Sequence, residues 1–127
     1  MTGMRTTLGK VRHLGSAHSG TGHFWTQRLT AVLNLILVTA TFAVLVSLSG
    51  AGYEETVATL TNPFVAILLL LTIINVSTHM RLGMQVFIED YVHGESLRLL
   101  ALIANTAFSA AVALAALYAV LKLNFGS

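Results

Sequence analysis

The sequence has no cysteine, a single proline among its 127 residues, and few charged side chains. Without cysteine, disulfides, thiolate metal sites and cysteine nucleophiles are all excluded, which leaves the five histidines as the only soft metal ligands. Charged residues make up 9% of the chain, against about 25% in an ordinary soluble domain. The formal net charge of +2, with no run of basic residues, argues against nucleic acid as a partner.

Apolar residues, by contrast, are abundant: they account for 55% of the chain, and the mean hydropathy is +0.78. A chain this short cannot bury so much apolar surface in a core of its own, so lipid is the expected solvent. Three stretches contain no charged residue, namely 29–53, 56–80 and 99–121. Each exceeds the roughly 20 residues that a helix needs to cross the hydrocarbon of a bilayer.

Helices satisfy their own backbone hydrogen bonds in lipid, so we predict an all-α integral membrane protein. The expected transmembrane helices cover about 29–50, 63–90 and 97–122. Residues 1–28 are polar and glycine-rich and are expected to form an arm before the three-helix domain of 29–127.

Single residues support these boundaries. Pro63 suits the first turn of the second helix, and Gly50 suits the end of the first. Each predicted helix also contains one asparagine that should face protein, because lipid offers an amide no hydrogen-bond partner. These asparagines are Asn34, Asn75 and Asn105.

The distribution of positive charge predicts the orientation. Four basic residues precede or open the first apolar run: Arg5, Lys10, Arg12 and Arg28. The segment 50–62 between the first two helices has two glutamates and no lysine or arginine, whereas Arg81 and Arg98 flank the second turn. The positive-inside rule therefore places the N-terminus in the cytoplasm.

His79 is the first candidate for chemistry, because a histidine inside a membrane span needs a reason to be there. Residues three or four apart share a helix face, so Gly83 lies one turn from His79 and leaves space beside the imidazole. That space would admit a flat, bulky group such as a porphyrin, and neutral imidazole is a common ligand of haem iron. A histidine hydrogen-bonded to a neighbouring helix fits the same pattern, and both interpretations stay open on these residues alone.

Asp90 and Tyr91 follow about 18 Å further along the same helix, at the expected cytoplasmic interface. Tyr91 could be an interfacial aromatic anchor and Asp90 a solvated helix end. Alternatively, the phenol could hydrogen-bond a quinone carbonyl while the carboxylate relays protons.

His79-x-x-x-Gly83-Met84 followed by Asp90-Tyr91 resembles the hydrophobic membrane anchor, or D subunit, of succinate dehydrogenase. The preceding segments 15–17, 19–20 and 23–31 resemble its alphaproteobacterial and mitochondrial-like members. The resemblance covers nearly the whole chain. The signatures of the paralogous C subunit, a Ser-x-x-His-Arg segment near the first helix and a His-x-x-x-Gly-x-x-His segment, are absent.

This resemblance implies that His79 is one axial ligand of a b-type haem, with the second ligand supplied by the C subunit. It implies that Tyr91 and Asp90 belong to the site where ubiquinone is reduced. Arg28 and His23 match positions near the haem propionates, although a positive-inside anchor and a solvated arm residue explain them equally well.

The implied partners are a second membrane anchor (the C subunit), an iron–sulfur subunit and a flavoprotein subunit that oxidises succinate. The chain has no flavin or cluster motif, so the resemblance gives it a positioning role in the bacterial inner membrane. Two alternatives remain: a structural or assembly subunit without a cofactor, and a small transporter subunit with His79 and Arg81 on an ion path.

Overall fold

The computed structural model describes residue 8 and residues 19–126 of the chain. Within that part the helices are α2 (Ser19–Ser47), α3 (Tyr53–Leu60), α4 (Pro63–Tyr91) and α5 (Glu95–Phe125). α2, α4 and α5 are each long and apolar enough to cross a membrane. The prediction of an all-α chain with three apolar spans is therefore confirmed.

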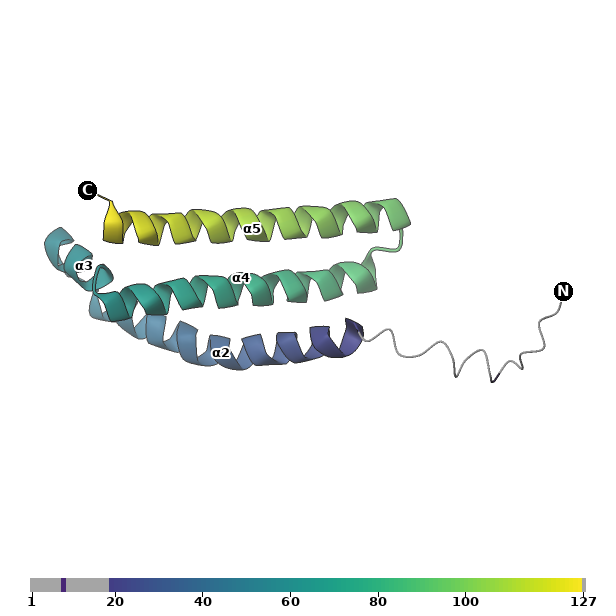
Figure 1. The fold of residues 1–127 in the computed structure, drawn as a ribbon, viewed down its shortest axis with the longest axis horizontal. Helices are drawn as coiled ribbons and strands as arrows, with labels where there is room; N and C mark the ends of the chain where they lie inside the picture. Colours follow the sequence, from purple (N-terminus) through teal and green to yellow (C-terminus); the bar gives the residue numbers. More distant parts are fainter. Residues whose placement is uncertain (1–7, 9–18, 127) are drawn as a thin grey trace.

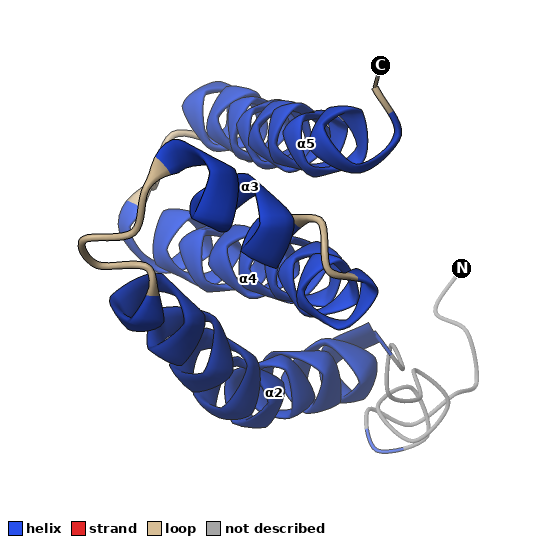
Figure 2. Cartoon of the chain, turned by 90° about the vertical axis from the view of Figure 1, so that its left-hand side faces the viewer, coloured by secondary structure: helices blue, strands red, loops and turns tan. Residues whose placement is uncertain are grey.

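The three long helices form a single curved row with α4 in the middle (Figures 1 and 2). α4 packs against α2 on one side and α5 on the other, whereas α2 and α5 do not touch. Successive helices run in opposite directions, so the start of α2, the end of α4 and the start of α5 lie at the same end of the row (Figure 1). The short helix α3 crosses the opposite end (Figure 2).

The start of α4 follows the local sequence signals. The side-chain oxygen of Asn62 accepts a hydrogen bond from the backbone N–H of Phe64 at 3.0 Å, and Pro63 occupies the first turn. α4 ends at Tyr91, one residue beyond the predicted end, and α5 extends the predicted 97–122 by two or three residues at each end. Both helices therefore lie close to where their apolar runs placed them.

The first helix differs from the prediction. α2 begins at Ser19 instead of residue 29, so residues 19–28, expected in the polar arm, are helical. This segment contains no proline, and His23 and Gln27 from it lie half-buried. Tertiary contacts stabilise a helix whose composition alone would not predict it. The rest of the arm, apart from residue 8, lies outside the described residues.

The other end of α2 also differs. The helix stops at Ser47, and Gly50 follows in a left-handed turn with φ of 85°. α3 was not predicted, because its eight residues are too short to register as an apolar run. A local signal is present all the same: Glu54 and Glu55 lie in its first turn, where carboxylates complement the partial positive charge of the helix N-terminus.

The chain buries few side chains, as expected where lipid replaces water around the helices. The described residues below 9% exposure include three apolar and three polar ones: Ala66, Leu82, Ile88, Thr30, Asn75 and Ser109. The helix–helix contacts are thus small and partly polar. In a membrane, packing and interhelical hydrogen bonds hold helices together, because burial of apolar surface gives no advantage over lipid.

Candidate functional site

Four polar residues of α2 form one stripe at spacings of four, three and four residues: His23, Gln27, Thr30 and Asn34. These spacings bring their side chains to one helix face. We call this face the α2 polar stripe. Thr30 is 7% exposed and the other three are half-buried, since the stripe packs against α4.

Asn75 of α4 binds the stripe directly. Its side-chain amide donates to the backbone carbonyl of Thr30 at 2.9 Å and to Oδ1 of Asn34 at 2.6 Å. On the other side of the row, the amide of Asn105 in α5 donates to the carbonyl of Arg81 at 2.9 Å. The expectation that all three asparagines face protein is confirmed, and their bonds fix the register of both helix pairs.

His79 lies one helical turn after Asn75 and meets the same stripe. Its Nδ1 is 3.0 Å from Oγ1 of Thr30. That hydroxyl also lies 2.8 Å from the carbonyl of Thr26 and 3.0 Å from that of Gln27, and both carbonyls can only accept. When the single hydroxyl proton points to a carbonyl, Thr30 accepts from Nδ1–H, and in that tautomer Nε2 carries the free lone pair.

Gly83 faces α2. A Cβ at this position would lie 3.5 Å from Nε2 of Gln27, an ordinary van der Waals contact, so this side chain borders the space expected beside His79. Two buried atoms of the α2 polar stripe lack a partner within the described part of the chain, namely Nε2 of His23 and Oε1 of Gln27. A buried polar atom without a partner is unfavourable unless a further group satisfies it.

The structure brings His23 to the interface with α4 but not Arg28. The Arg28 guanidinium is exposed and lies 4.7 Å from the centre of the Phe24 ring. Five residues after His23, Arg28 points to another face of α2. The two residues assigned to haem propionates by resemblance thus occupy different surfaces of one helix.

Tyr91 and Asp90 are exposed at the end of α4, twelve residues beyond His79. The Tyr91 ring stacks on Phe87 with centroids 4.6 Å apart and an interplanar angle of 27°. The stack orients the phenol beside the α4–α5 turn and leaves 68% of the residue exposed. This chain therefore supplies one side of any site there.

Thr30 and Gln27 were not singled out from the sequence, although a signal existed. Polar residues recur at helical spacing from His23 to Asn34, on both sides of the point where the uncharged run begins. In the described part of the chain no group of three or more histidine or carboxylate side chains could hold a bare metal ion. Haem iron needs fewer protein ligands, because the porphyrin occupies its equatorial positions and side chains supply only the axial ones.

Three apolar spans joined by polar helix–helix contacts define a multi-pass membrane protein. The chain belongs to the succinate dehydrogenase/fumarate reductase transmembrane subunit family, whose model matches residues 2–120.

Several relatives carry the name of a succinate dehydrogenase membrane anchor subunit. One from Paracoccus denitrificans is 33% identical over 114 residues, covering 90% of this chain and 88% of the relative. Another, from Rickettsia bellii, is 32% identical over 83% of this chain and 84% of its own length. A third, from Reclinomonas americana, is 34% identical over 73% and 80% respectively. No solved structure matches the chain. The resemblance to succinate dehydrogenase anchor subunits is thus confirmed.

Proposed function

We propose that this anchor subunit contributes His79 as one axial ligand of a haem b that it shares with a second anchor, the C subunit. The observation that carries the proposal is the 3.0 Å contact between Nδ1 of His79 and the hydroxyl of Thr30. With Nδ1 as the donor, this contact leaves the Nε2 lone pair available to iron, and it is the type of outer contact that orients metal-bound histidines.

The donors near His79 fit a haem. When bound, haem b supplies a one-electron redox centre inside the membrane. Asn75 fixes the distance between α2 and α4 and thereby holds Thr30 beneath the imidazole. The buried Nε2 of His23 lacks a partner and would hydrogen-bond a propionate. Arg28 lies on a different face of α2, so it would have to reach the other propionate around the helix to pair with it through charge-assisted hydrogen bonds.

Tyr91 and Asp90 would bind ubiquinone as substrate at the end of α4. The stacked ring of Phe87 holds the phenol in place, and the exposed hydroxyl is free to donate to a quinone carbonyl. Reduction to quinol consumes two electrons and two protons, and a carboxylate beside the phenol is suited to passing protons inward. The remaining walls of the pocket would come from partner subunits.

The proposed complex also contains the iron–sulfur subunit and the flavoprotein subunit, which would carry electrons from succinate to the quinone. The positive-inside pattern supports a bacterial inner-membrane location with the N-terminus in the cytoplasm. In that orientation Tyr91 lies at the cytoplasmic surface, where the soluble subunits would dock. This arrangement connects the tricarboxylic acid cycle with respiratory electron transport.

The visible spectrum of the purified complex tests the haem assignment. His79→Leu should abolish or strongly perturb the low-spin b-type bands, because an axial ligand is lost. His93→Leu is the matched control, since His93 lies in the exposed turn after α4 and should leave the bands unchanged. Unchanged bands in His79→Leu would assign the ligand elsewhere. A wild-type complex that purifies without haem would favour a structural or assembly subunit instead.

A further inference from the structure

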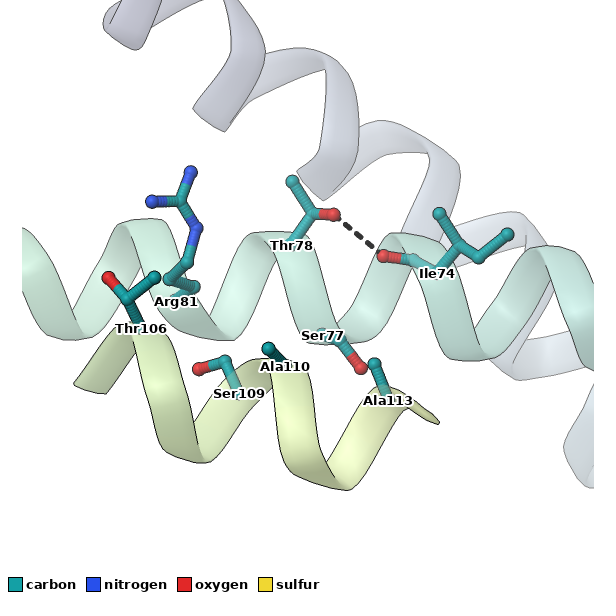
Figure 3. A pocket seen from close by; sticks show the side chains of 8 residues that line it. All are labelled: Ile74, Ser77, Thr78, Arg81, Thr106, Ser109, Ala110 and Ala113. Carbon is teal, nitrogen blue, oxygen red and sulfur yellow. Dashed lines mark hydrogen bonds between the residues drawn. The ribbon is translucent and has the colours of Figure 1, made fainter. Parts of the chain in front are cut away.

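A groove of about 290 Å³ runs between α4 and α5, on the side of α4 away from His79. Figure 3 shows Arg81 at one end of the groove, with Ile74 and Ala113 at the other. Arg81 follows His79 by two residues, which turns it about 200° around the helix and away from α2. The groove is therefore independent of the proposed haem and quinone sites.

Two of its polar groups have no partner among residues 19–126. Ser109 is 3% exposed, and its hydroxyl, buried in the wall of the groove, makes no hydrogen bond. The guanidinium of Arg81 forms no ion pair or hydrogen bond with any residue from 19 to 126, although the residue is half-buried. A cation in this position is unfavourable unless a counter-charge or hydrogen-bond acceptor reaches it.

The depth of the groove in the membrane indicates which group supplies the counter-charge for Arg81. Counting about 20 residues from Pro63 across the hydrocarbon places its edge near Leu82. Arg81 thus lies at the level where lipid phosphates begin. From there the groove runs toward the bilayer centre and loses its charge, past Ala110 to Ser77, Ile74 and Ala113 (Figure 3). A phospholipid also changes from charged to uncharged in this direction.

We propose that this groove binds an anionic phospholipid. The phosphate pairs with the Arg81 guanidinium, and the hydroxyls of Thr106 and Ser109 lie beside the headgroup linkage. One acyl chain lies along the small residues Ala110 and Ala113, which leave room between the helices. Basic pockets between transmembrane helices are known to hold anionic headgroups.

A lipid fits this groove better than a transmembrane helix of a partner. A partner helix, about 10 Å across, would need an acidic residue at the level of Arg81 to neutralise it. An anionic phospholipid already carries its charge at that depth and its apolar chain below it. Charge complementarity and the polarity gradient therefore both favour the lipid.

The test uses the assembled complex, stripped of lipid in detergent and titrated with phosphatidylglycerol or phosphatidylcholine, with bound lipid counted by native mass spectrometry. Wild type should bind phosphatidylglycerol at this site more tightly than phosphatidylcholine. Arg81→Gln should weaken phosphatidylglycerol binding about tenfold or more, because it removes a charge-assisted contact to phosphate. Arg98→Gln is the matched control: Arg98 is exposed in the first turn of α5, outside the groove, and should leave binding unchanged.

A second variant tests the groove without changing Arg81, in case Arg81→Gln disturbs folding. Ala110 is exposed, so Ala110→Leu can fill the groove without disturbing the helix contact, and it should also displace the lipid. A photo-crosslinking residue at position 110 in native membranes should capture phospholipid. Equal lipid binding by wild type, Arg81→Gln and Ala110→Leu would overturn the proposal. Capture of a polypeptide at position 110 would overturn it too, because the groove would then be a protein interface.

Discussion

Removal of the Thr30 hydroxyl is the most direct test of the contact between α2 and His79. Thr30→Val keeps the β-branched shape and the helix contact but deletes the hydroxyl that contacts Nδ1, which in the proposed tautomer accepts from Nδ1–H. The imidazole then loses a bond of 3.0 Å at a position that is 7% exposed, so water cannot readily replace it. We expect the complex to assemble with haem but with altered electronic properties.

The direction of the change follows from the ligand. An imidazole that donates its Nδ1–H to an acceptor is a stronger electron donor at Nε2, and it stabilises ferric iron. Loss of the bond should therefore raise the haem reduction potential. A hydrogen bond is worth about 0.5–1.5 kcal/mol net, and about 59 mV corresponds to a tenfold change for one electron. The rise should thus reach at most about 65 mV.

A potentiometric titration of the haem bands in the purified complex measures this shift, and haem content per complex measures retention. Thr39→Val is the matched control, because Thr39 is exposed on the same helix and its hydroxyl bonds only to the carbonyl of Leu35. Thr39→Val should leave both quantities unchanged. Identical potentials and haem contents in the two variants would refute the role assigned to Thr30.

Two further predictions concern Tyr91 and Asn75. Tyr91→Phe keeps the stacked ring but deletes the donor, so quinone reductase efficiency should fall roughly two- to thirteenfold, the effect of about 0.5–1.5 kcal/mol; Asp90→Asn should behave similarly. Succinate oxidation with an artificial acceptor serves as the control, and unaltered quinone kinetics would leave Tyr91 as a membrane anchor only. Asn75→Leu removes both amide bonds to α2 and should destabilise the complex by about 1–2 kcal/mol. Thermal unfolding in detergent should show a larger loss than for Asn124→Leu, whose interhelical bond is 3.5 Å long, and equal losses would contradict this role for Asn75.

The long apolar helices were predictable because a bilayer imposes a length and a composition that can be counted along the chain. The start of α4 was also predictable, because Asn62 and Pro63 are signals within the local sequence. The beginning of α2 was not, because residues 19–28 are polar and their helical turns depend on contacts with α4, which a composition argument does not contain. α3 is too short for hydropathy to detect.

The candidate site was likewise predictable only in part. His79 and Tyr91 could be chosen from the sequence, since a polar residue in or beside a span attracts attention by itself. The role of Thr30 depends on a contact across 49 positions in the sequence. Threonine is also common in apolar helices, where its hydroxyl can bond the preceding turn. The space beside Gly83 could not be judged from the sequence, because it depends on which residue faces the glycine. In the structure that residue is Gln27.

The row arrangement of the helices affects how the protein can be built. α2 and α4 meet without any help from α5, because α5 packs on the far side of α4 and has no contact with α2. A helical hairpin of neighbouring segments can assemble in the bilayer as soon as its second helix has been inserted. His79 would then be joined to Thr30 while α5 is still being synthesised, so the proposed haem ligand is already oriented in an unfinished subunit.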